Sequence, residues 1–123
     1  MIRVLLVDDQ GSFREGLREL FATVAGVEIA GEATNGADAV EQALRVRPDV
    51  VLMDIRMPGM DGIAATRALR AQNPEACVLM LTTFDEDDLV ANAIQAGAMG
   101  YLLKGTPIED IVSILHLALR GYT

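Results

Sequence analysis

The strict alternation of short apolar segments with helix-forming segments is the feature that most constrains the fold of this chain. Four apolar runs have the pattern of strands buried on both faces of a sheet: residues 4–7, 50–53, 78–81 and 101–103. A further segment, residues 27–33, alternates apolar and polar side chains, which indicates a strand at the edge of a sheet. Five strands separated by helical segments predict an α/β fold.

Apolar residues recur at helical spacing between these strands. They are Phe13, Leu17, Leu20, Phe21 and Val24, then Val40, Ala43 and Leu44, and later Leu89, Val90, Ala93 and Ile94. Another helix is predicted over residues 61–71, with Asp61 as its N-cap. The last helix is predicted to begin with a capping box of Thr106 and Glu109, with Pro107 in the first helical position.

This βα alternation predicts a parallel sheet with helices on both faces, joined by right-handed crossovers. For five strands the common arrangement is the flavodoxin-like (βα)5 doubly wound sheet in the order 2-1-3-4-5, which places the alternating segment at an edge. Ligands bind such sheets where the strand order reverses, at the carboxyl ends of the first and third strands. The 123 residues fit one domain, residues 1–123.

Composition excludes several classes of function. The net charge of −8 repels phosphate backbones, so this domain alone is not expected to bind nucleic acid. No apolar run approaches the roughly 20 residues that span a bilayer, so no membrane association is expected. The single cysteine, Cys77, excludes an internal disulfide and fits a cytoplasmic protein, and its apolar neighbours predict a core residue.

Three aspartates are predicted to meet where the strand order reverses. Asp8 and Asp9 end the first strand, and Asp54 ends the third. One aspartate in such a place is most often a turn or cap residue, but three carboxylates at one edge repel one another. A hard divalent cation with oxygen ligands would offset this repulsion, and Mg²⁺ is the predicted ion.

A hydroxyl and an ammonium group follow two further strands that end at this edge. Thr82 follows the fourth strand and Lys104 follows the fifth. Each alone is common at a protein surface. Together with the aspartates they form a set suited to phosphoryl transfer to a carboxylate, where cations offset charge on the transferring group.

These residues resemble the receiver domain of two-component response regulators over essentially the whole chain. The matching pieces are Val7-Asp8-Asp9, Met53-Asp54 with residues 57–62, Leu81-Thr82, and residues 100–104. Residues 82–88 resemble the subgroup whose output domain is a LuxR-type helix-turn-helix. We expect any such output domain to lie outside residues 1–123, and regulation of transcription to require it.

The resemblance implies a phosphoacceptor switch in a two-component phosphorelay. Asp54 would receive a phosphoryl group from the phosphohistidine of a sensor histidine kinase. Asp8, Asp9 and the backbone carbonyl of Arg56 would bind Mg²⁺ together with Asp54. The output would be a change in affinity for a partner or for a second copy of the chain.

The remaining site residues implied by the resemblance follow the last two strands. Thr82 and Lys104 would contact the phosphoryl oxygens, and Tyr101 would swing inward as Thr82 moves. Tyrosine in a strand is also a common half-buried edge residue. Many receivers have a cis proline directly after this lysine, whereas Gly105 follows it here, so a cis bond is not expected.

The resemblance also bears on how long the phosphoryl group persists. In receivers, the side chains two positions beyond the phosphorylated aspartate and the threonine border the path of the hydrolytic water. Here they are Arg56 and Phe84. Arginine offers only donors and phenylalanine forms no hydrogen bond to water, so we expect slow autodephosphorylation and no other enzyme activity.

The last helix carries more apolar residues than one face requires. Its predicted core stripe is Ile108, Ile111, Val112, Leu115 and Leu119. Ile114 and Leu117 project elsewhere, which fits isolated surface residues or part of a homodimer surface. His116 is predicted to be exposed late in this helix, and the acids at 85–88 to cap the preceding helix.

Three other functions remain open at this point. A haloacid-dehalogenase-type phosphatase also uses an aspartyl nucleophile, but it needs two acids separated by one residue, unlike the adjacent Asp8 and Asp9. A flavodoxin-like cofactor carrier needs phosphate-binding amides and hydroxyls where this chain has carboxylates. A constitutive scaffold that is not phosphorylated would not require so complete a site.

Overall fold

The computed structural model describes residues 1–83 and 87–121 and contains the predicted alternation of strands and helices. The strands are β1 (Ile2–Val7), β2 (Val27–Ala33), β3 (Val50–Asp54), β4 (Val78–Thr82) and β5 (Gly100–Leu103). They form a parallel sheet in the order β2-β1-β3-β4-β5, as the sequence predicts. β3 and β4 each run one residue further than predicted, to Asp54 and Thr82.

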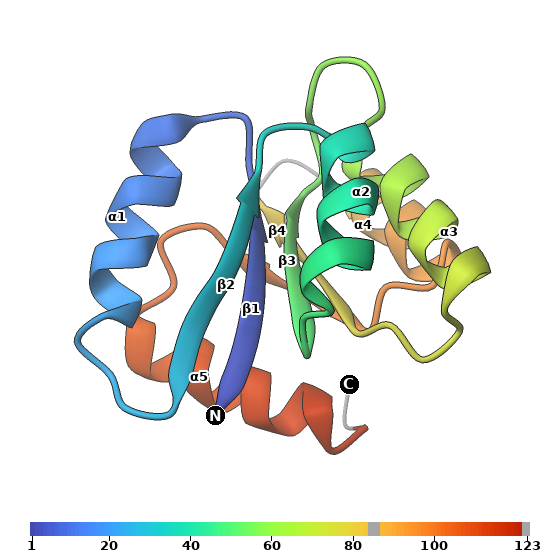
Figure 1. Cartoon of the computed structure of the whole chain (residues 1–123). Helices are drawn as coiled ribbons and strands as arrows, with labels where there is room; N and C mark the ends of the chain where they lie inside the picture. The colour runs from blue at the N-terminus through green and yellow to red at the C-terminus, as the bar shows by residue number, and fades with distance from the viewer. Residues whose placement is uncertain (84–86, 122–123) are drawn as a thin grey trace.

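Helices cover both faces of the sheet (Figure 1). They are α1 (Gly11–Phe21), α2 (Gly36–Val46), α3 (Gly62–Gln72), α4 (Asp87–Gln95) and α5 (Ile108–Leu119). α1 and α5 pack on one face, where Phe21 and Leu115 join a buried apolar cluster with β1 and β3. α2, α3 and α4 pack on the other face, where Leu69 and Ala93 contribute to a second cluster. The chain is therefore a three-layer α/β sandwich with one buried sheet.

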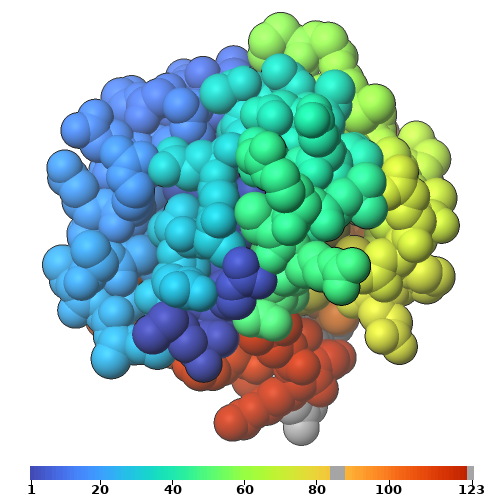
Figure 2. All heavy atoms as spheres, viewed as in Figure 1, coloured from blue at the N-terminus to red at the C-terminus, as the bar shows by residue number. Residues whose placement is uncertain are grey.

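The exposure of the strands explains their order. Every residue of β3 and β4 is buried, whereas the four central residues of β2, from Ile29 to Glu32, are only partly buried. In the space-filling view, atoms of β2 reach the surface between those of α1 and α2 (Figure 2). A strand that is half exposed can occupy only an edge, which confirms the position predicted from its alternating pattern.

Two helix starts were predicted from capping residues, with different outcomes. Asp61 is the N-cap of α3, because its Oδ1 accepts a hydrogen bond from the amide of Ala64 at 2.9 Å. The capping box predicted for α5 is wrong. Pro107 is the N-cap, α5 begins one residue later, and the hydroxyl of Thr106 donates instead to the carbonyl of Leu103 at 2.6 Å.

The apolar residues of α5 also differ from the prediction. Ile114 was predicted to project away from the core, but it is partly buried and packs against the core. Ala118 is buried, whereas Leu119 is 41% exposed. Leu119, four residues after Leu115, no longer faces the sheet because of the helical rotation. The small side chain of Ala118 therefore packs into the core in its place. His116 is exposed and Cys77 is buried, as predicted. Asp85 and Glu86 lie outside the described residues, and no described helix is long and apolar enough to cross a membrane.

Candidate functional site

The parallel sheet brings the three predicted aspartates together at the carboxyl ends of β1 and β3. One carboxylate oxygen from each of Asp8, Asp9 and Asp54 lies within 4.8 Å of the others. Asp8 and Asp54 are buried, with relative exposures of 0% and 5%, whereas Asp9 is exposed. Two buried carboxylates and one at the rim form a pocket of hard oxygen ligands that opens to solvent.

Lys104 supplies the positive charge of the site. Its Nζ lies 2.8 Å from Oδ2 of Asp8 and 3.4 Å from Oδ2 of Asp54. Its Nζ also lies 4.9 Å from the centre of the Phe13 ring, a cation–π distance. The helical spacing of apolar residues in the sequence predicted Phe13 only as part of the apolar stripe of this helix. The lysine is thus held between two carboxylates and an aromatic face.

Burial and charge shift the ionisation of this cluster. Burial, with a further contribution from Asp8, raises the pKa of Asp54 from 3.8 to about 6, although Lys104 opposes the shift. Burial alone would lower the pKa of Lys104, but its contacts with Asp8 and Asp54 outweigh this effect and raise that pKa. The carboxylates therefore keep Lys104 charged, whereas burial and the charge of Asp8 make Asp54 a weaker acid than an exposed aspartate.

The segment after β3 passes close to the phosphoacceptor candidate. The amide of Gly62 donates to the carbonyl of Ile55 at 2.9 Å, which draws the start of α3 against the end of β3. A Cβ on Gly62 would overlap the backbone carbonyl of Asp54, so glycine is required at this position. Arg56 is exposed and lines an open hollow at the mouth of the site together with Asp9.

Thr82 and Tyr101 lie in different surroundings. Thr82 is buried at the end of β4, and its hydroxyl donates to the carbonyl of Thr83 at 3.0 Å. The carbonyl of Thr82 accepts a hydrogen bond from the amide of Lys104 at 2.9 Å, which ties the ends of β4 and β5 together. Tyr101 is 53% exposed and lines an apolar groove with Ile94 and Leu117, so it does not contact the carboxylates.

The loop after Lys104 takes the form expected without proline. The Lys104–Gly105 peptide bond is trans. Gly105 has a φ of 92°, a conformation that glycine adopts without strain. Phe84, which was predicted to border the path of the hydrolytic water, lies outside the described residues.

Comparisons with known proteins agree with this geometry. The family described as "Response regulator receiver domain" matches residues 4–116. The response regulator GacA of Pseudomonas viridiflava is 39% identical over 121 residues, which are 98% of this chain and 56% of that protein. The transcriptional regulatory protein LiaR of Bacillus subtilis is 40% identical over 98% of this chain and 57% of its own length. The chain thus spans little more than half the length of these relatives.

A solved structure is similar over nearly the whole chain. It is a LuxR-family two-component response regulator from Aurantimonas sp. SI85-9A1, with a TM-score of 0.91 and 33% identity. The match covers 99% of this chain and 87% of that one. The similarity therefore extends through every described strand and helix.

Proposed function

The chain belongs to the response regulator receiver domain family, and from that membership we propose that Asp54 accepts a phosphoryl group from the phosphohistidine of a partner histidine kinase. The observation that carries the proposal is the setting of Asp54. Its buried carboxylate lies at the reversal of strand order, among two further carboxylates and 3.4 Å from the Lys104 ammonium. These groups suit phosphoryl transfer to a carboxylate, because cations at such a site offset charge on the transferring group.

The transfer needs little covalent chemistry from the protein. A carboxylate oxygen of Asp54 forms a bond to phosphorus while the bond from phosphorus to the kinase imidazole breaks. The imidazole nitrogen leaves with the bonding electron pair. Because the pKa of Asp54 is about 6, most of the carboxyl is ionised at neutral pH and no separate base is needed.

The carboxylates fit a divalent cation. Asp8, Asp9 and Asp54 offer three hard oxygen ligands within 4.8 Å of one another, and we assign Mg²⁺ to them together with the backbone carbonyl of Arg56. When bound, Mg²⁺ would offset negative charge on the transferring phosphoryl group. Without it, the ammonium of Lys104 offsets part of the charge of the two buried carboxylates.

Thr82 and Lys104 are the groups proposed to sense the phosphoryl oxygens. The Thr82 hydroxyl donates to Thr83 in this structure, so it would have to turn in order to donate to a phosphoryl oxygen. Tyr101 is half exposed in β5, the strand next to β4, where it pairs with Met80 two residues before Thr82. We assign to Tyr101 the inward movement that follows the turn of Thr82. The phosphorylated arrangement then differs from this one at the surface that Tyr101 occupies.

The output is proposed to be a change in affinity. Ile114 and Leu117 line the same apolar groove as Tyr101, which makes this face the proposed surface for a partner or a homodimer. Relatives include a transcriptional regulatory protein and a LuxR-family regulator, so we propose a cytoplasmic regulator of transcription that binds DNA through a separate output domain.

The phosphoacceptor assignment is tested with a small phosphodonor. Incubation with acetyl phosphate and Mg²⁺ should add one acid-labile phosphoryl group to the wild-type protein, detected by intact-mass spectrometry. Asp54→Asn should show no adduct, whereas Asp110→Asn, an exposed aspartate of α5, should label normally. An undiminished adduct on Asp54→Asn would place the phosphoacceptor elsewhere.

A further inference from the structure

Asp8 is held by hydrogen bonds to its backbone and to Oδ1, and by an ion pair at Oδ2. It is fully buried, its amide donates to the carbonyl of Ala33 at 3.1 Å, and its Oδ1 accepts from the amide of Gln10 at 2.8 Å. Its Oδ2 is paired with Lys104. The last polar atom, its backbone carbonyl oxygen, accepts a hydrogen bond from Nη1 of Arg14 at 2.6 Å. The arginine thus bonds the backbone of this residue, while the carboxylate is bonded by other groups.

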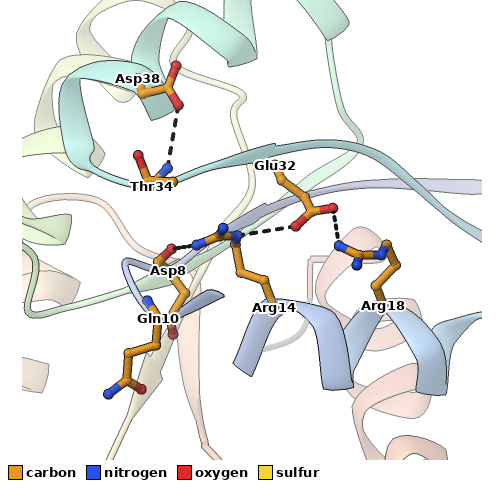
Figure 3. A network of polar contacts seen from close by, with 7 residues as sticks. All are labelled: Asp8, Gln10, Arg14, Arg18, Glu32, Thr34 and Asp38. Carbon is orange, nitrogen blue, oxygen red and sulfur yellow. Dashed lines mark hydrogen bonds and ion pairs between the residues drawn. The ribbon is translucent and has the colours of Figure 1, made fainter. Parts of the chain in front are cut away.

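Arg14 is itself aligned by an acid from another element. It projects from the first turns of α1, and its Nε donates to Oε1 of Glu32 in β2 at 3.2 Å (Figure 3). The second oxygen of Glu32 accepts from Nη1 of Arg18 at 2.6 Å. Arg14 is only 18% exposed, whereas Arg18 is 47% exposed and no contact with Asp8 is described for it. In the part of the chain that the structure describes, Arg14 bonds both Glu32 and the carbonyl of Asp8, whereas Arg18 bonds Glu32 but not Asp8.

We propose that Arg14, oriented by Glu32, is a positioning residue for the metal-binding turn formed by Asp8 and Asp9. The carbonyl that Arg14 bonds belongs to the peptide group joining these two aspartates. Fixing the plane of that peptide fixes the direction in which the following residue leaves it. Asp9 is exposed, so its backbone is what sets the position of its carboxylate. The inference rests on the proposed function, because it requires the metal site assigned above.

The geometry explains why the residue is arginine. A guanidinium is a rigid fork that can donate to the Asp8 carbonyl and to Glu32 at once, whereas an ammonium on a flexible stem does not match that pair of directions. Groups that orient metal ligands without touching the metal usually change metal affinity by about 10- to 100-fold when they are removed. Arg14 would likewise orient the carboxylates of Asp8 and Asp9 without binding the metal itself.

The test compares Mg²⁺ affinity among variants of the two arginines. Isothermal titration with MgCl₂ should give a Kd about tenfold higher for Arg14→Ala than for wild type. Arg18→Ala is the matched control, since it removes the other contact to Glu32 from the same helix, and its Kd should stay within about twofold of wild type. Arg14→Lys should resemble Arg14→Ala, because it keeps the charge but not the fork. Urea denaturation would confirm that each variant is folded at the titration temperature.

The outcomes separate this inference from the proposed function. A wild-type Kd for folded Arg14→Ala, or equal weakening in Arg14→Ala and Arg18→Ala, would overturn the positioning role. If Arg14→Ala does not fold, the same comparison is made with Arg14→Lys, and a wild-type Kd there would also overturn it. Absence of Mg²⁺ binding by the wild-type protein would instead refute the metal site itself.

Discussion

The ionisation of Asp54 should set how the stability of the metal-free protein depends on pH. Its pKa rises from 3.8 to about 6 on folding, because burial and the neighbouring Asp8 disfavour the charged form. Between these two values the folded protein binds more protons than the unfolded chain. The free energy of unfolding therefore falls as the pH rises through this window, and then levels off above it.

The size of the effect follows from the two pKa values. Each pH unit between them is worth about 1.4 kcal/mol, so ionised Asp54 costs the folded protein about 3 kcal/mol at neutral pH. Asp54→Asn removes the charge and keeps the shape. In EDTA it should exceed wild type in unfolding free energy by about 2–3 kcal/mol at neutral pH, and the gain should shrink toward zero near pH 4.

Urea denaturation of both proteins across this pH range measures the difference. Asp110→Asn serves as the control, since Asp110 is exposed in the first turn of α5, where a carboxylate stabilises the helix. It should therefore be no more stable than wild type at any pH. The reasoning is refuted if Asp54→Asn is not stabilised at neutral pH, or if its gain is the same at both ends of the range.

Three further predictions concern the metal, the lysine and the lifetime of the phosphorylated state. Mg²⁺ should raise the melting temperature, by the equivalent of about 2.7 kcal/mol at a hundredfold excess over Kd; an unchanged melting temperature in millimolar Mg²⁺, with no rise in Asp9→Asn, would contradict this. Lys104→Ala should still allow some phosphorylation but should weaken phosphorylation-dependent partner binding, and normal binding would refute its role. After donor removal the wild-type protein should lose phosphate over many minutes, and Arg56→Asn with Phe84→Glu should lose it faster; decay within seconds, or no acceleration, would count against the hypothesis.

The fold and the meeting of the aspartates were predictable because both depend on periodicity. A parallel sheet buried on both faces requires continuous apolar strands, and the alternating pattern of β2 allows only an edge position. Once the strand order is known, any residue that ends β1 or β3 must lie at the same edge. Asp8 and Asp54 could therefore be placed together although they are 46 positions apart in the sequence.

What the sequence did not predict depends on atomic contacts that no spacing encodes. The start of α5 is shifted by one residue because Pro107, rather than Thr106, takes the N-cap position, which removes the capping box. The link from Glu32 through Arg14 to the carbonyl of Asp8 depends on how closely α1 packs beside β2, and this is set by the core beneath both elements. The aspartates themselves follow from strand periodicity, whereas the groups that orient them follow only from tertiary packing. A test of such an orienting role must therefore compare neighbouring residues such as Arg14 and Arg18. Both lie in the same helix and bond Glu32, but Arg14 also bonds the carbonyl of Asp8.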